Sequence, residues 1–170
     1  GKQMMEHQAR EAIAGKNIEM VIARCFSFVG FGQPGHLAIS QFISDALKHD
    51  NLRINSDGRV VRSYLYAADL AVWLLALLSR GQAGRTYNVG SPAPLTLHEV
   101  ASLVRDTLAP TSGIEVLNRV STAPRQRYVP DSRRIEQDLR VSCWTPLTSA
   151  IRSTAAALTL EKQAGVSKAL

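Results

Sequence analysis

Several features are scarce or absent in this sequence of 170 residues, and each absence excludes a class of protein. The only cysteines, Cys25 and Cys143, show no CxxC or Cys/His spacing, so we expect buried free thiols and no structural zinc. No Gly-x-Ser-x-Gly or His-Glu-x-x-His motif points to hydrolysis, and the four histidines are dispersed. The sequence therefore predicts no metal site.

Long hydrophobic runs are also missing, and we expect no secretory leader. The longest apolar stretch, 70–78, falls well short of the ~18 residues that a membrane-spanning helix needs. The N-terminus lacks the basic-then-apolar layout of a signal peptide. With 45% hydrophobic and 20% charged residues the chain can bury a core, which excludes wholesale disorder. We therefore expect a soluble, cytoplasmic protein with no membrane partner.

The charge balance is basic, with 20 Lys and Arg against 14 Asp and Glu and a formal net charge of +6. Most of these basic residues are arginines, whose guanidinium groups suit bidentate contacts with phosphate or carboxylate. The arginines are scattered singly, however, and no basic run with interleaved aromatic residues appears. We therefore expect most of them on solvated faces, and we expect no nucleic-acid partner.

The hydrophobic periodicity predicts strands that alternate with helices in a single α/β unit over residues 1–170. The apolar run 20–23 is typical of a strand covered on both faces. Thr96 and Glu99 have the spacing of a capping box, which predicts that a helix begins there. The predicted strands are 17–28, 52–54, 60–66, 86–89 and 114–117, and the predicted helices are 3–15, 37–47, 68–78, 96–108, 131–139 and 146–161.

Five segments carry a resemblance to one family. Segment 24–30, RCFSFVG, resembles the family's Arg-x-x-Asn-x-Tyr-Gly, and segment 62–71, RSYLYAADLA, is similar to its Arg-x-aromatic-aliphatic-Tyr/His-Val-x-Asp-x-Ala. Further signatures match YNVG at 87–90, YVPD at 128–131 and WTPL at 144–147. In this order they resemble the C-terminal half of an extended short-chain dehydrogenase/reductase of the NAD-dependent epimerase/dehydratase family, which remodels nucleotide-sugars.

The resemblance implies an α/β fold, with the C-terminal part of a Rossmann-like sheet and the small substrate-binding lobe of such an enzyme. The family's Gly-x-x-Gly-x-x-Gly loop, whose amides approach the dinucleotide pyrophosphate, does not occur in this sequence. The glycine-rich stretch 30–35 follows the wrong strand, and Pro34 removes an amide and disfavours helical geometry at Gln33. We therefore expect the parent enzyme to bind NAD or NADP, and this chain alone to bind neither.

The resemblance also implies a catalytic and cofactor-binding candidate. The family's Tyr-x-x-x-Lys signature has its lysine at Lys2, and its tyrosine would lie four positions earlier, outside the sequence. In such enzymes the lysine lowers the pKa of the tyrosine, which takes a proton as the sugar loses hydride, and it contacts the nicotinamide ribose. The alternative is that Lys2 is a frayed terminal lysine in solvent.

Other candidates follow from the same resemblance. Phe26 and Ser27 match positions that wall the nicotinamide, and Ser27 also matches a sugar contact; a core aromatic and a serine bonded to backbone are the alternatives. His36 matches a loop over the sugar and base, or it contacts only water. Arg62 is the strongest substrate candidate, because the family's matching arginine binds the diphosphate and a guanidinium on a strand can form two hydrogen bonds with it. The alternative is that Arg62 forms a surface ion pair.

The remaining candidates lie in loops and at helix starts. Arg125 and Arg127 precede the 128–131 segment, where the family offers basic groups to the nucleotide; solvated loop positions are the alternative. Asp69 and Asp131 are expected to cap helices or to suit their dipoles. Asn88 is expected to support the turn that follows its strand; the alternative is that it reaches the site.

These observations predict the substrate-binding C-terminal portion of an NAD-dependent nucleotide-sugar epimerase or dehydratase, inactive alone and connected with polysaccharide synthesis. The alternative is a non-catalytic module from a truncated reading frame that binds nucleotide-sugars or oligomerises. We expect a nucleotide-sugar substrate. We also expect homo-oligomers, because an incomplete sheet would expose the apolar run 20–23 at its edge.

Overall fold

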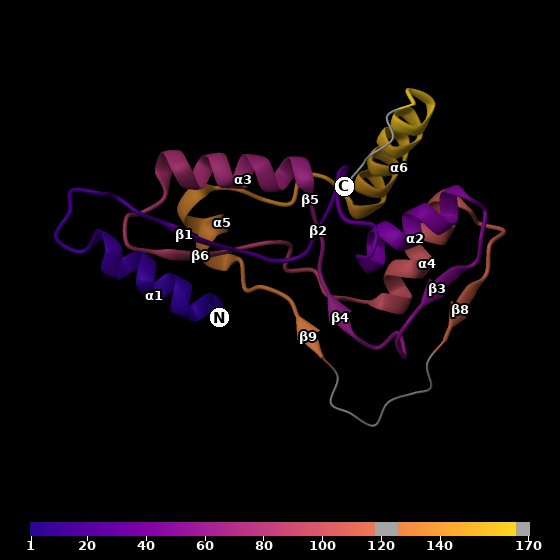
Figure 1. Cartoon of the computed structure of the whole chain (residues 1–170), viewed down its shortest axis with the longest axis horizontal. Coiled ribbons are helices and arrows are strands. Elements are labelled where there is room, and N and C mark those ends of the chain that lie inside the picture. The colour runs from indigo at the N-terminus through magenta and orange to yellow at the C-terminus, as the bar shows by residue number, and fades with distance from the viewer. Residues whose placement is uncertain (118–125, 166–170) are drawn as a thin grey trace.

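Strands and helices alternate along the chain in this computed structural model, which describes residues 1–117 and 126–165 (Figure 1). The helices are α1 (Lys2–Ile13), α2 (Ala38–Leu47), α3 (Ala67–Arg80), α4 (Leu97–Leu108), α5 (Arg133–Leu139) and α6 (Leu147–Gln163). The strands are β1 (Ile22–Cys25), β2 (Phe28–Val29), β3 (Leu52–Ile54), β4 (Val61–Arg62), β5 (Leu65–Tyr66), β6 (Thr86–Val89), β7 (Leu95–Thr96), β8 (Ile114–Val116) and β9 (Arg127–Tyr128). The predicted α/β class is confirmed.

Parallel pairing dominates the strands. β1 pairs with β6, β2 with β5, and β3 with β8, all in parallel. A fourth sheet places β4 in the centre, antiparallel to β7 and parallel to β9. Because β4 has a neighbour on each side, the backbone of Arg62 is held by two strands from later parts of the chain.

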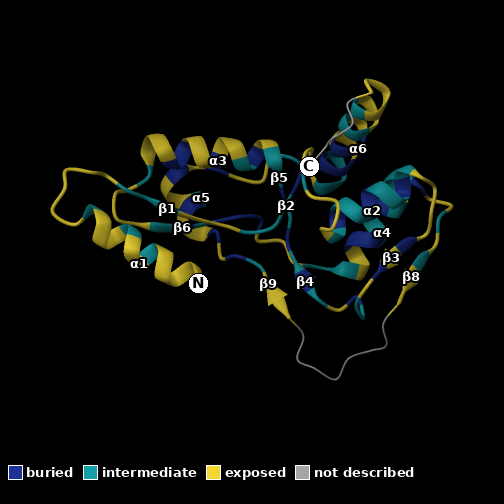
Figure 2. Ribbon diagram, in the orientation of Figure 1, coloured by how far each residue is buried: buried dark blue, intermediate teal, exposed yellow. Residues whose placement is uncertain are grey.

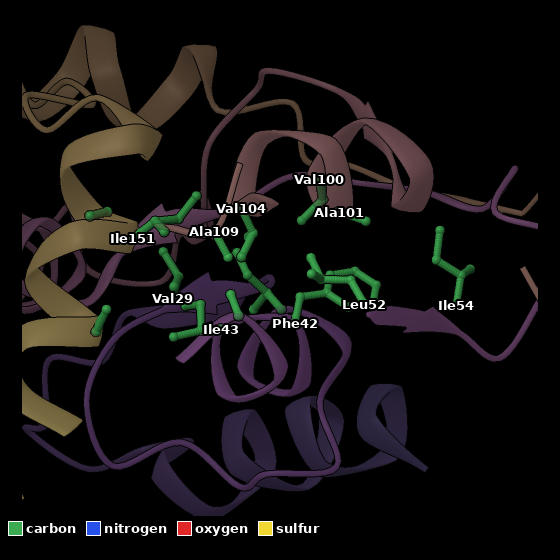
Figure 3. Packing of buried hydrophobic residues seen from close by; sticks show 14 residues of the cluster. Val29, Phe42, Ile43, Leu52, Ile54, Val100, Ala101, Val104, Ala109 and Ile151 are labelled. Carbon is green, nitrogen blue, oxygen red and sulfur yellow. The ribbon is translucent and has the colours of Figure 1, made fainter. Parts of the chain in front are cut away.

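Two hydrophobic clusters hold these elements together (Figure 2). The larger lies between α2, α4 and α6 and includes Phe42, Leu52 and Ile151 (Figure 3). The second packs Trp73 of α3 against Tyr87 of β6 and residues of α5. Burying each such large side chain contributes about 1.5–3 kcal/mol. The two clusters thus stabilise the regions on either side of the short strands β2, β4 and β5.

The start of α4 shows how local sequence directs the fold. The Thr96 hydroxyl accepts the backbone N–H of Glu99 at 3.1 Å, and the Glu99 carboxylate accepts the backbone N–H of Thr96 at 2.6 Å. These two bonds satisfy amides that the first turn of a helix leaves without partners. The predicted capping box is confirmed.

The run 20–23 lies at an open edge, as expected for an incomplete sheet, and it is not covered on both faces as its apolar character suggested. Strand β1 begins only at Ile22, and none of its residues is buried. It pairs with β6, and α1 reaches it through polar contacts such as that between Arg24 and Glu6. An apolar run makes a strand suitable for burial, but other elements of the chain must pack against the strand before it is buried.

The state of the two thiols also differs from expectation. Cys25 and Cys143 are free cysteines, as predicted, but both residues are exposed rather than buried. Cys25 ends the open strand β1, and Cys143 lies in the extended segment between α5 and α6. The thiols are nevertheless shielded enough that burial raises the pKa of each.

One face of α3 presents apolar side chains to solvent. Val72, Leu75 and Leu78 are 48%, 64% and 83% exposed, whereas Trp73 and Leu77 on the other face are buried. No helix in the described ranges is long and apolar enough to cross a membrane. Exposed apolar side chains therefore occur on one face of α3, and they also occur on α1, where Met4 and Met5 are 59% and 67% exposed.

Candidate functional site

A mostly apolar pocket of about 310 Å³ lies where β2, β4 and the beginning of α2 meet. Phe26, Ser27 and Arg62, three of the residues proposed from the sequence, line it together with Gln33 and Tyr64. These residues come from segments 26–33 and 62–64, which are distant in sequence. The structure therefore brings the predicted cofactor-side and substrate-side residues into one hollow.

The segment after β1 is held in place by backbone contacts. The N–H of Phe26 donates to the carbonyl of Val89 at 2.9 Å, and the N–H of Leu65 donates to the carbonyl of Ser27 at 3.2 Å. A Cβ atom at Gly90 would lie 2.8 Å from the Cβ of Phe26, closer than real Cβ atoms approach. The absence of a side chain at Gly90 thus allows Phe26 to reach the wall of the pocket.

Arg62 lies beside an aromatic pair. The rings of Phe26 and Tyr128 stack with their centroids 4.5 Å apart and an interplanar angle of 26°. The guanidinium carbon of Arg62 lies over the Tyr128 ring, 5.7 Å from its centroid, and Nη1 donates to the carbonyl of Val61 at 3.0 Å. Within the described residues, Arg62 makes no ion pair with a carboxylate. The Tyr128 ring and the Val61 carbonyl therefore hold the positively charged guanidinium of Arg62 at the pocket.

Sequence reasoning did not propose Gln33, Tyr64 or Tyr128 as parts of this site. Gln33 follows Gly32, whose φ of 82° turns the loop, and its Nε2 donates to the carbonyl of Phe28 at 2.9 Å. Burial raises the pKa of the Tyr64 hydroxyl, so this group stays a neutral phenol against the pocket. Tyr128 was part of a quoted signature, but only the pairing of β9 with β4 shows that it reaches Arg62.

The other predicted substrate residues lie outside this pocket. His36 is exposed and lines a separate depression of about 220 Å³ with Arg53. Arg127 lines another, of about 410 Å³, with Val61 and Glu99. In the β4–β9 register Arg127 is opposite Val61 and Tyr128 is opposite Arg62, so Arg127 occupies the other face of the strand. Arg125 lies outside the described residues.

Lys2 is the first residue of α1 and is exposed. It is not among the described residues that line the pocket. Its positive charge acts on Cys25, where it lowers the pKa of the thiol against the larger opposing effect of burial. The structure therefore places Lys2 beside the end of β1 rather than in the pocket, and its proposed catalytic role stays a prediction.

A larger polar groove of about 560 Å³ lies beside β1, β6 and α5. Arg24 forms two bonds of 2.7 Å with the Glu6 carboxylate, and this contact lowers the pKa of Glu6. Arg85 pairs with Asp138 at 3.0 Å. Carboxylates of the chain itself therefore engage both of these guanidinium groups.

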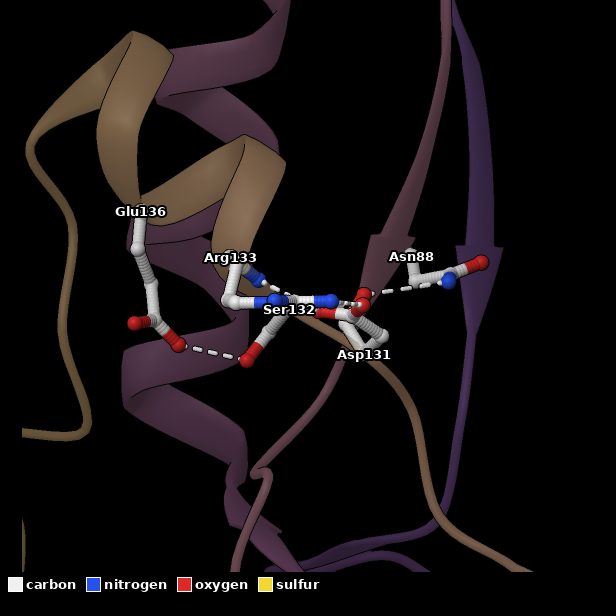
Figure 4. A network of polar contacts seen from close by, with 5 residues as sticks. All are labelled: Asn88, Asp131, Ser132, Arg133 and Glu136. Carbon is white, nitrogen blue, oxygen red and sulfur yellow. Dashed lines mark hydrogen bonds and ion pairs between the residues drawn. The ribbon is translucent and has the colours of Figure 1, made fainter.

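The same groove contains the polar contacts at the start of α5 (Figure 4). The Asn88 side chain donates to the carbonyl of Asp131 at 3.1 Å, so it holds this segment rather than the turn after its own strand, which was the expectation. Asp131 accepts the N–H of Arg133, the first residue of α5, at 3.1 Å, although the N-cap position of this helix is Ser132. The Arg133 guanidinium lowers the pKa of Asp131 to about 2.

Asp69 suits the dipole of α3, which is one of its two predicted roles, but it does not cap the helix. It lies in the first turn of α3 and is 6% exposed, but its side chain makes no capping bond to its own helix. The carboxylate instead accepts the N–H and the hydroxyl of Thr145, at 2.9 and 3.0 Å. It therefore ties α3 to the segment that leads into α6.

The fit of the described residues to a dinucleotide differs between its two ends. Phe26 and Ser27, which the resemblance assigns to the nicotinamide, line the pocket that follows β1. The loop 30–35 does not fit the pyrophosphate, because Pro34 has no N–H and α2 begins only at Ala38, so no row of amides meets a helix start. No group of three or more potential metal ligands occurs within the ranges described.

Comparison with known proteins relates the whole arrangement to one family. The family model described as "NAD dependent epimerase/dehydratase family" matches residues 1–90. The chain is 28% identical over 151 residues to UDP-glucuronic acid decarboxylase 1 of Arabidopsis thaliana, covering 88% of this chain and 34% of that protein. It is 27% identical over 139 residues to dTDP-glucose 4,6-dehydratase of Streptomyces griseus, covering 82% and 42%. The chain thus spans about a third to two fifths of the length of these relatives.

Solved structures share the fold at lower identity. An epimerase from Methanothermobacter thermautotrophicus superimposes with a TM-score of 0.81 at 19% identity, over 94% of this chain and 48% of that one. UDP-glucuronic acid 4-epimerase from Bacillus cereus, solved with UDP-glucuronic acid and NAD, gives 0.77 at 21% identity, over 91% and 50%. The match to the family model covers more than half of the 170 residues, and the chain therefore belongs to the NAD-dependent epimerase/dehydratase family of extended short-chain dehydrogenases/reductases.

Proposed function

We propose that this chain is the nucleotide-sugar-binding portion of an NAD-dependent epimerase or dehydratase. The observation that supports this function best is the position of Arg62, which presents an uncompensated guanidinium beside an apolar pocket that also contains Ser27. A fork of N–H donors suits a diphosphate, and an apolar hollow suits the flat faces of a sugar and a base. The named activities of the relatives, on UDP-glucuronic acid and dTDP-glucose, are consistent with this class of ligand.

In this proposal each residue has a binding role. Arg62 contacts the diphosphate, and the Ser27 hydroxyl donates to or accepts from the sugar. Phe26 forms an apolar wall that excludes water next to the reacting sugar carbon. When bound to the whole enzyme, NAD or NADP would accept and return hydride. The residues of this chain fit only the nicotinamide end of that cofactor, so we propose that the chain alone has no turnover.

Titration of the 170-residue chain with UDP-glucose, followed by calorimetry, tests the binding function. A charge-assisted hydrogen bond contributes about 1.5–3 kcal/mol, so Arg62→Ala is expected to weaken binding about 10- to 100-fold. Arg152→Ala, on the exposed side of α6, is the matched control and is expected to leave the affinity unchanged. Equal affinities for the native chain and Arg62→Ala would contradict the assignment.

A second experiment distinguishes the enzyme portion from a non-catalytic module. Reading the DNA upstream of Gly1 is expected to reveal an open frame with a glycine-rich loop and a tyrosine four positions before Lys2. A start codon at this point would instead favour the module that binds nucleotide-sugars or oligomerises. NAD-dependent turnover by the purified chain would contradict the proposed inactivity.

Self-association and a cytoplasmic location remain part of this proposal. The apolar face of α3, with Val72, Leu75 and Leu78 exposed, supports homo-oligomer formation, because apolar patches of this kind tend to be covered. Light scattering at rising protein concentration is expected to show oligomers, and a monomer throughout would contradict this expectation.

A further inference from the structure

Tyr128 is the described residue whose position is best suited to control Arg62. It lies on β9, opposite Arg62 on β4 in a parallel register, and paired residues on neighbouring strands carry their side chains on the same face of a sheet. The Arg62 guanidinium carbon lies 5.7 Å from the centre of the Tyr128 ring. Tyr128 is not among the residues that line the pocket, so its relation to the site runs through Arg62.

The Tyr128 ring is itself held in position. It stacks on Phe26 at 4.5 Å, and the backbone of Phe26 is bonded to Val89. The arginine thus has two restraints, the tyrosine ring and the carbonyl of Val61, which accepts from Nη1 at 3.0 Å. Neither restraint is a carboxylate, so the guanidinium is oriented while its positive charge is kept.

We propose that Tyr128 is a positioning residue that pre-organises Arg62 for the diphosphate of the ligand. This inference rests on the proposed function and extends it to a residue that does not contact the ligand. A long arginine side chain loses conformational freedom when it binds an anion, and a ring that already restrains it reduces that loss. The affinity for a diphosphate should therefore depend on Tyr128, whereas the affinity for a ligand without phosphate should not.

Calorimetric titration of the full chain with UDP and with uridine tests this inference. Loss of the cation–π contact and of the pre-organisation is expected to weaken UDP binding about 5- to 50-fold in Tyr128→Leu. Tyr128→Phe keeps the ring and is expected to stay within about twofold of the native affinity. Uridine affinity is expected to change less than about twofold in both variants, because Arg62 has no phosphate to hold.

A double-mutant cycle shows whether the effect passes through Arg62. In an Arg62→Ala background, Tyr128→Leu is expected to cause no further loss of UDP affinity beyond about twofold. Phe26→Leu removes the ring that supports Tyr128; because Phe26 also lines the pocket, its effect through Tyr128 is the part of the UDP loss that disappears in the Arg62→Ala background. This second route guards against a substitution at Tyr128 that disturbs β9 itself.

Each other outcome overturns the inference. If Tyr128→Leu weakens UDP equally with and without Arg62, or weakens uridine as much as UDP, the tyrosine contacts the ligand directly. If Arg62→Ala weakens UDP and Tyr128→Leu does not, the positioning role fails while the proposed function stands. If UDP binds the native chain and Arg62→Ala equally, or does not bind, both fail.

Discussion

The contact between Asp69 and Thr145 makes a quantitative prediction about stability. Asp69→Ala removes a buried carboxylate that accepts two hydrogen bonds from Thr145, at 2.9 and 3.0 Å. A donor left without a partner costs about 1–3 kcal/mol when buried, but Thr145 is only half-buried and water replaces part of the loss. We therefore expect the free energy of unfolding to fall by about 2–4 kcal/mol.

Two further variants separate the parts of this loss. Asp69→Asn keeps one carbonyl acceptor and is expected to lose about 1–2 kcal/mol, and Thr145→Val removes only the hydroxyl and is expected to lose about 1 kcal/mol. Asp106→Ala is the control, because Asp106 forms an exposed ion pair with Arg105 that contributes about 0–1 kcal/mol.

Urea unfolding followed by circular dichroism measures all of these variants, and the midpoint shifts convert to free energy if the slopes agree. A double-mutant cycle between Asp69→Ala and Thr145→Val isolates the bond to the hydroxyl. The reasoning would be refuted if Asp69→Ala destabilised the chain no more than Asp106→Ala does.

Three other predictions concern single contacts. Thr96→Ala breaks the capping box of α4 and is expected to lower the free energy of unfolding by about 0.5–2 kcal/mol in the same urea assay. The pKa of Asp131 is lowered to about 2, so the stabilisation by Arg133 is present above about pH 4 and disappears as the pH falls through 2. An NMR titration of the Asp131 carboxyl group should show this low pKa, and the pKa should rise towards 3.8 in Arg133→Gln. Burial raises the pKa of Cys25, so alkylation by iodoacetamide at pH 8 should be slower than for a small free thiol, and Lys2→Ala should slow it further.

Local sequence signals predicted the helices well. The capping spacing at Thr96 placed the start of α4, and the apolar spacing along 37–47 placed α2 to within a residue. Such signals succeed because capping bonds and an apolar helix stripe depend on residues a few positions apart.

Strand pairing and burial depend on partners that are distant in the chain. β7 and β9 are two residues long and exist only because both pair with β4, so no periodicity could reveal them. The apolar run 20–23 looked like a buried strand, but its exposure depends on what packs against it. The free cysteines were identified correctly, whereas their burial was a matter of the same distant packing.

Motifs in the sequence identified Arg62 as a site candidate, but they did not identify the residues that support its side chain. Arg62 and Ser27 were proposed from motifs, and the structure places both at one pocket. Arg127 was proposed with them, but the alternation of side chains along β9 puts it on the opposite face from Tyr128. Only the register between two strands decides which of two adjacent residues can approach Arg62.

The close approach at Gly90 implies that a change outside the pocket can alter the shape of the pocket. A single added methyl group there would press on Phe26 at 2.8 Å and on Pro130 at 3.2 Å, although Gly90 itself lines no part of the pocket described above. A side chain at Gly90 would then displace both Phe26 in the wall of the pocket and Pro130 in the segment that follows β9. Substitution of Gly90 is therefore expected to reshape the pocket without replacing any residue that lines it.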